Sequence, residues 1–345
     1  MKKAKKAKKA IDIFSVLVFV LIVLATNSCR RQDMIGTQRV VQIQIGLENH
    51  PGEPTTEAIY EWARLANERS GGSLVMEVFP SSQLGSKDEL ADMMLAGMSV
   101  ITLANGGFFA ARGAPDMGIV FGPYFYPSWE DAWKLQASDW WKEQERLLEA
   151  RGLKILAPNW QYGDRHTLTT RPIRTVEDMR GLKLRVPNNP MQVLGTNVMG
   201  AIATPMPMAE VYTALQQGVI DGVENPLAVL YGSRWFEIAP YLSLTGHIRD
   251  NTMWFTGTAF FNSLSPEHQR ILVETGIEAG CFNNRLMETA DQEALQRLMA
   301  AGVTVIEIDV NSFVRATRSF YTLPELTRQW SPGLYETTSR AMGRR

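Results

Sequence analysis

Segments with the periodicity of β-strands alternate along the chain with segments that have the periodicity of α-helices. Residues 39–45 alternate apolar and polar side chains, and the apolar residues between 59 and 66 recur at the spacing of one helix face before Gly71-Gly72. The same two periodicities predict further strands at 73–79, 99–104, 183–186 and 220–224, and further helices at 87–97, 191–199 and 208–217. Because such alternation is typical of folds in which helices cover a sheet, the sequence predicts an α/β fold.

Two longer segments follow in the second half of the chain. Residues 252–261 form a long β-like run, and Ser265-Pro266-Glu267 carries the start signals of a helix that reaches about residue 301. No low-complexity linker or shift in composition divides the chain into sequential domains. Two lobes that each take chain from both halves would produce this pattern.

The N-terminal residues have the features of a secretory signal. Six lysines within residues 1–9 precede an apolar run at 13–25, which ends near Asn27-Ser28-Cys29. A membrane-spanning helix needs about 20 apolar residues, so an uncleaved anchor is the weaker alternative. The sequence therefore predicts an exported protein with a signal peptide at residues 1–28.

Cys29 refines this prediction. The segment Thr26-Asn27-Ser28-Cys29 resembles a relaxed form of the box at which bacterial lipoproteins are cleaved and acylated. We predict lipid attachment at Cys29, with residues 29–38 as a tether; plain cleavage near the same place is the alternative. Cys281 is the other cysteine of the chain, and we expect it to be a small buried side chain.

Charge and missing motifs narrow the function classes. Removal of residues 1–28 takes away six lysines and one aspartate, which leaves 29 basic against 35 acidic residues and changes the formal charge from −1 to −6. An acidic chain is a poor candidate for nucleic-acid binding, and its membrane contact would come from the lipid. Zinc, Walker and dinucleotide-binding motifs are missing from the sequence, so no metal or cofactor is predicted.

Two arginines twenty residues apart lie in predicted strands and suit a carboxylate site. Arg165 lies in the motif Gly-Asp-Arg-His-Thr, and Arg185 lies in the motif Gly-Leu-Lys-Leu-Arg. A guanidinium presents its donors in a rigid fork that matches the two oxygens of a carboxylate. Each arginine has an ordinary alternative: Arg185 could lie on the surface of an edge strand, and Arg165 could form an ion pair with Asp164 or another acid.

These two motifs, together with the segment that ends in Glu224-Asn225-Pro226, resemble the corresponding motifs of the DctP-type solute-binding proteins of tripartite ATP-independent periplasmic (TRAP) transporters. The resemblance covers roughly residues 40 to 344. It implies a two-lobed periplasmic-binding-protein (Venus-flytrap) fold with a hinge strand and a long helix that spans both lobes. It further implies that residues 39–162 plus 251–290 form lobe I, and residues 163–250 plus 291–345 form lobe II.

The resemblance also implies the ligand-binding residues. Arg185 matches the arginine that forms the salt bridge to the ligand carboxylate, Arg165 matches a second arginine that adds a charge-assisted donor, and Asn225 matches an asparagine that contacts the ligand. Further candidates match the family less firmly; they are Glu48, Asn105, Asn189 and Met208.

The implied ligand is a small organic acid, and the motifs around Arg185 and Asn225 favour a sugar acid. Phe108 and Asn105 stand where sialic-acid binders of the family carry an arginine and an acid, which disfavours sialic acid. The implied partners are a small and a large integral membrane subunit that use a sodium gradient. Two alternatives stay open: an exported lipoprotein enzyme that acts on carbohydrate acids, and a ligand-sensing protein for a membrane receptor.

Overall fold

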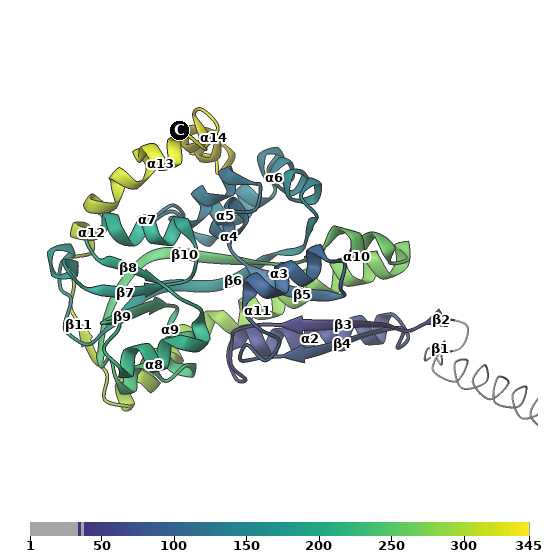
Figure 1. The fold of residues 1–345 in the computed structure, drawn as a ribbon, viewed down its shortest axis with the longest axis horizontal. Helices are drawn as coiled ribbons and strands as arrows, with labels where there is room; N and C mark the ends of the chain where they lie inside the picture. The colour runs from purple at the N-terminus through teal and green to yellow at the C-terminus, as the bar shows by residue number, and fades with distance from the viewer. Residues whose placement is uncertain (1–33, 36–37, 345) are drawn as a thin grey trace, which may run out of the picture.

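The computed structural model describes residues 34–35 and 38–344 of the chain, which form an α/β molecule (Figure 1). The predicted signal peptide, Cys29 and most of the predicted tether lie outside the described residues. No helix within the described ranges combines the length and the apolar character of a membrane span. The α/β class predicted from the alternation is confirmed.

One nine-stranded sheet runs through the molecule in the order β4-β3-β5-β10-β6-β9-β7-β8, with β11 beside β10. We call the half that contains β3, β4 and β5 the first lobe, and the half that contains β7, β8 and β9 the second lobe. The strands are β3 (Val41–Gly46), β4 (Leu74–Phe79), β5 (Val100–Ala104), β6 (Leu153–Thr169), β7 (Lys183–Val186), β8 (Ile202–Pro205), β9 (Gly222–Asn225), β10 (Tyr241–Gly257) and β11 (Thr304–Ile306); β1 (Met34–Ile35) and β2 (Gln38–Arg39) form a separate pair.

Helices cover this sheet. The α-helices are α2 (Pro54–Arg69), α3 (Lys87–Leu95), α4 (Gly106–Ala110), α5 (Trp129–Gln136), α6 (Asp139–Ala150), α7 (Pro190–Val198), α8 (Val211–Gln216), α9 (Leu227–Gly232), α10 (Thr258–Ser263), α11 (Pro266–Ala300), α12 (Val310–Thr317), α13 (Pro324–Thr327) and α14 (Leu334–Ala341). Short 3-10 turns are η1 (Pro115–Phe121), η2 (Val176–Met179), η3 (Met208–Glu210), η4 (Trp235–Glu237) and η5 (Arg318–Thr322).

Two long antiparallel strands, β6 and β10, join the lobes. Each has 17 residues, and their pairing extends from Leu153↔Gly257 beside β5 to Thr169↔Tyr241 beside β9 and β11. The predicted hinge strand is therefore present, but its predicted bounds, 252–261, are wrong. It starts earlier, and residues 258–263 form α10, because a short run with several apolar residues fits a helix as well as a strand.

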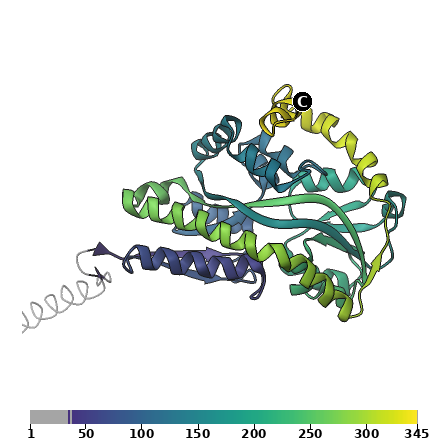
Figure 2. The same cartoon turned by 180° about the vertical axis from the view of Figure 1, so that it is seen from behind.

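The helix α11 spans both lobes, as predicted (Figure 2). Ser265 caps it by accepting a hydrogen bond from the backbone of His268. In the first lobe, the α11 backbone at Gly276 packs against Trp62 of α2, and further along, Leu298 lies in the core of the second lobe. The expectation for Cys281 was wrong: its side chain is exposed, because the inward positions of that turn belong to neighbouring residues.

Aromatic side chains fill the core of the first lobe on both faces of the sheet. Trp62, Trp160 and Trp254 lie within 5.3–6.2 Å of one another between the sheet and the helices α2 and α11. On the other face Phe109 meets Phe255 edge to face at 5.0 Å. This packing holds the halves of β6 and β10 that border the first lobe in a fixed position.

The C-terminal segment packs on both lobes. Phe313 of α12 lies in a cluster with Leu184 of β7, whereas Phe320 and Trp330 join the aromatic core of the first lobe. The Trp330 indole also donates to the backbone oxygen of Pro115 at 3.1 Å. The lobe boundaries stay a prediction, and this packing favours ending the second lobe's share of the C-terminal segment near residue 317.

Candidate functional site

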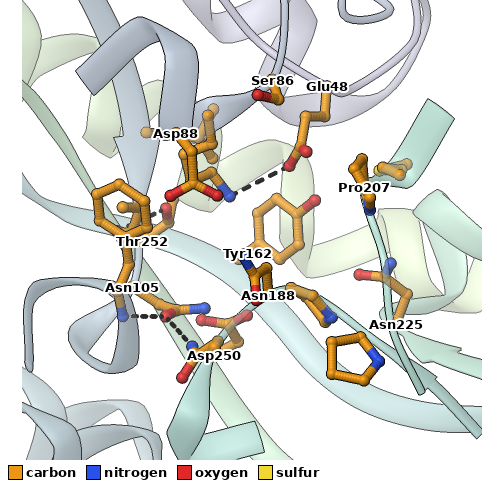
Figure 3. A pocket seen from close by; sticks show the side chains of 18 of the residues that line it. Glu48, Ser86, Asp88, Asn105, Tyr162, Asn188, Pro207, Asn225, Asp250 and Thr252 are labelled. Atoms are coloured by element: carbon orange, nitrogen blue, oxygen red, sulfur yellow. Dashed lines mark hydrogen bonds and ion pairs between the residues drawn. The ribbon is translucent and has the colours of Figure 1, made fainter. Parts of the chain in front are cut away.

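A cavity of about 270 Å³ lies where the two lobes meet, beside the long strands β6 and β10. In Figure 3, Glu48 lies above the cavity, Asp250 below it and Asn225 at its right. All seven ligand-binding candidates line it, although their contact with a ligand stays a prediction: Glu48, Asn105, Arg165, Arg185, Asn189, Met208 and Asn225.

Strand ends bring these side chains together. In the first lobe β3 and β5 are parallel, and Glu48 and Asn105 follow their carboxyl ends. In the second lobe β7 is parallel to β9; it carries Arg185 and is followed by Asn189, while Asn225 ends β9. Binding sites of α/β sheets usually lie at the carboxyl ends of parallel strands. In this molecule the carboxyl ends of the parallel strands of both lobes border the same cavity.

Arg185 is a buried cation without an acidic partner among the described residues. Its side chain is 2% exposed, and its Nε and Nη2 donate to the backbone oxygen of Met206 at 3.0 and 2.7 Å. Among the described residues, no carboxylate oxygen lies within 4.0 Å of its guanidinium. Burial lowers the pKa of Arg185 to about 10, against the pull of Glu48 and Glu224, so the group stays charged at neutral pH. A buried charge of this kind is costly until an anion joins it.

Arg165 is in the opposite situation, because two acids already hold it. Its Nε and Nη2 donate to the two oxygens of Glu224 at 2.5 and 2.7 Å, and its Nη1 donates to Asp250 Oδ2 at 2.8 Å. The ion-pair alternative is therefore what the structure shows, although Asp164 is not the partner. Asp164 is the neighbour of Arg165 in a strand, so it points to the other face of the sheet and pairs with Arg249 at 2.8 Å.

Glu224 anchors this buried network. Burial on its own would raise the pKa of its carboxyl, but the charge and hydrogen bonds of Arg165, together with His247, lower it to about 2. Gln192 donates a further hydrogen bond to Glu224 at 2.6 Å. Glu224 is thus ionised and held from several sides, and it fixes the position of Arg165 at the cavity wall.

Two buried acceptor oxygens on the cavity lack hydrogen-bond partners among the described residues. One is Oδ1 of Asn225, whose side chain is 3% exposed, and the other is Oδ1 of Asp250, whose side chain is 2% exposed. Asp250 is not among the site residues predicted from the sequence. The only signal would have been an acid inside a long strand whose first half the periodicity did not reveal.

The first-lobe candidates already have partners. Glu48 forms an ion pair with Lys87 at 3.2 Å. Asn105 caps α4, and its Oδ1 accepts a hydrogen bond from Asn189 Nδ2 of the second lobe at 3.2 Å. The hydrogen bond between these two asparagines joins the lobes directly beside the cavity.

Apolar and aromatic side chains complete the wall. Met208, at the start of η3, is buried and lines the cavity together with Phe108 and Tyr162. Trp160 does not line the cavity and belongs to the first-lobe core. Within residues 34–35 and 38–344, no group of three or more His, Cys, Asp or Glu side chains is arranged to hold a metal ion.

Comparisons with known proteins agree on one kind of molecule. The model of the family described as bacterial extracellular solute-binding protein, family 7, matches residues 45–322. The 2,3-diketo-L-gulonate-binding periplasmic protein of Escherichia coli K12 is 32% identical over 273 residues, which is 79% of this chain and 83% of that protein.

Two solved structures are similar over 88% of this chain and 99% of theirs. A TRAP periplasmic solute-binding protein of Actinobacillus succinogenes 130z with bound L-galactonate superposes with a TM-score of 0.84 at 37% identity. Another from Ochrobacterium anthropi, with bound L-fuconate, gives a TM-score of 0.85 at 38% identity. These similarities match the two-lobed fold seen in this chain.

Proposed function

The chain belongs to the bacterial extracellular solute-binding proteins of family 7, the solute-binding proteins of TRAP transporters, and on that premise we propose that it captures a sugar acid for transport. Members of this family bind solutes and are not enzymes, which decides against the enzyme alternative. The ligand would be handed to a small and a large integral membrane subunit that use a sodium gradient.

The observation that supports this proposal best is the uncommitted charge of Arg185. The other cations on the cavity wall are engaged, since Arg165 pairs with Glu224 and Asp250, and Lys87 pairs with Glu48. One free buried cation suits one ligand carboxylate. The relatives with bound L-galactonate and L-fuconate, and the diketogulonate-binding relative, favour a sugar acid as the molecule that carries it.

Binding would close the two lobes around the ligand. Arg185 and Asn225 belong to the second lobe and Glu48 and Asn105 to the first, so a ligand that touches both sets is held best when the lobes are together. It therefore shifts the hinge equilibrium toward the closed form. Exclusion of water from the closed cavity strengthens the contact between Arg185 and the carboxylate.

A thermal-shift screen of the protein without its predicted signal peptide tests the proposal. L-galactonate, L-fuconate and 2,3-diketo-L-gulonate would be compared with C4-dicarboxylates, sialic acid and the uncharged sugars galactose and fucose. A ligand that binds only the folded state stabilises it by about 2.7 kcal/mol at a hundredfold excess over Kd. We expect shifts with L-galactonate, L-fuconate or 2,3-diketo-L-gulonate and none with the comparison ligands; equal shifts with galactose or fucose would contradict the proposal.

Lobe closure gives a second prediction, at Gly107. An added methyl group there would lie 2.4 Å from Asn189 Nδ2, across the contact between the lobes. Gly107→Ala should therefore penalise the closed form and raise Kd for the sugar acid about tenfold, at a cost within the usual 1–3 kcal/mol of overpacking. Isothermal titration calorimetry measures the effect. Gly107→Ala should cost less when it is made in an Asn189→Ala variant, where the clashing amide is absent, than in the wild type.

Export and anchoring are a separate part of the proposal. We propose that residues 1–28 direct export, that Cys29 carries the lipid and that the binding domain stays outside the cytoplasmic membrane. Cys29→Ser should then move the protein from the membrane fraction to the soluble fraction of the producing cells. An unchanged distribution on immunoblots of the two fractions would rule out lipid attachment at Cys29.

A further inference from the structure

Asp250 occupies an unusual position for an acid in a site that takes an anion. It lies in the middle of β10, lines the cavity and is 2% exposed. Its Oδ2 accepts a hydrogen bond from Arg165 Nη1 at 2.8 Å, whereas its Oδ1 has no partner among the described residues. An ionised carboxylate can only accept hydrogen bonds, so this oxygen requires a donor from the molecule that enters the cavity.

The charge state of Asp250 strengthens this requirement. Burial raises the pKa of its carboxyl to about 6, although Arg165 opposes the shift. At neutral pH the group is therefore mostly ionised. The hydrogen bond to one of its two oxygens offsets only part of the cost of burying this charge. A hydroxyl group that donates to Oδ1 would stabilise the ionised form, because hydrogen bonds to charged acceptors are the stronger ones.

The other free groups of the cavity fit the same ligand chemistry. Oδ1 of Asn225 is a second buried acceptor that finds no partner in the described part of the chain, and Arg185 is the cation that no described acid pairs with. The free groups thus call for one carboxylate and at least two hydroxyl donors. A second carboxylate would bring more acceptors and a like charge against Asp250, at a cost in affinity.

We propose that Asp250 determines ligand specificity: its free oxygen accepts a hydrogen bond from a ligand hydroxyl, and its charge excludes a second ligand carboxylate. The favoured ligand is a polyhydroxy monocarboxylate, that is, an aldonate rather than the corresponding diacid. This inference rests on the proposed function, because it concerns the same cavity and assumes that Arg185 holds the carboxylate.

Calorimetric titration of the protein with matched acids tests the role of Asp250. L-galactonate and D-gluconate would be compared with the diacids galactarate and D-glucarate, and with hexanoate, which has the chain length without the hydroxyls. Asp250→Ala should weaken aldonate binding about 10- to 100-fold and leave hexanoate unchanged. Asp250→Asn keeps the shape without the charge, and it should improve the affinity for a diacid relative to its aldonate about tenfold or more.

Asp164→Asn is the matched control. Asp164 also pairs with an arginine between β6 and β10, but it does not line the cavity, so its replacement should leave every affinity ratio as in the wild type. Wild-type ratios in both Asp250 variants would overturn the specificity role while the proposed function stands. A wild-type protein that binds none of these sugar acids would instead overturn the proposed function, and this inference with it.

Discussion

Arg185→Met should weaken sugar-acid binding strongly without unfolding the protein. The methionine side chain fills much of the space of the arginine but offers no charge and no donors, so the ligand carboxylate would be buried without its main partner. The expected loss is about 2–5 kcal/mol, which raises Kd at least about 30-fold. Calorimetric titration with the sugar acid that gives the largest thermal shift measures the loss.

The stability of the ligand-free variant separates this explanation from simple damage. Arg185 is buried and forms no ion pair with a described residue, so its removal takes away an uncompensated charge. The melting temperature of the ligand-free Arg185→Met protein should therefore equal or exceed that of the wild type. Arg185→Lys should also bind weakly, because a point charge replaces the bidentate fork.

Arg249→Met is the control for this experiment. Arg249 lies on β10, pairs with Asp164 at 2.8 Å and does not line the cavity. The Arg249→Met protein should bind the sugar acid as tightly as the wild type. Full affinity in a folded Arg185→Met variant would remove Arg185 from the site and leave the carboxylate to another group.

The sequence candidates all line one cavity, but the sequence did not show which of their charges are paired with one another. Both arginines were expected on strands, and the structure places Arg165 in β6 and Arg185 in β7. Strand β7 also has the predicted bounds of 183–186. However, the acids that hold Arg165 lie 59 and 85 residues away. They reach it only through the pairing of β6 with β9 and β10, which no local pattern specifies. The sequence neighbour Asp164 was the natural guess, and the alternation of faces along a strand makes it wrong.

The missed first half of β10 has a related cause. Residues 241–251 include buried polar side chains such as Ser243, Thr245, His247 and Asp250, so they do not show the apolar alternation of a half-buried strand. Their burial depends on partners from distant segments, for example the His247 contact with Glu224. Asp250 was overlooked for this reason, because a functional acid in a strand becomes visible only once the strand is placed.

Glu224→Gln should destabilise the folded protein strongly, by about 3–5 kcal/mol, because it removes the main counter-charge of a buried arginine. Arg165 would keep only Asp250, whose carboxyl has a pKa of about 6 and is therefore a weaker partner in mildly acidic solution. Urea unfolding followed by tryptophan fluorescence measures the free energy of unfolding. Replacing both members of the pair, as in Arg165→Met with Glu224→Gln, should cost less than the glutamine alone, since no unpaired charge then remains.

The pH dependence gives this prediction a definite sign. The pKa of Glu224 falls from 4.5 to about 2 on folding, so its ionised form contributes stability that is present above pH 4.5 and is lost as the pH falls toward 2. The difference between wild type and Glu224→Gln should therefore shrink over that interval. Glu237→Gln is the control, because Glu237 also holds an arginine, Arg234, but at an exposed site where solvent screens the pair. Equal losses in the two variants, or a Glu224→Gln loss that does not change with pH, would show that the buried pair with Arg165 does not support the fold.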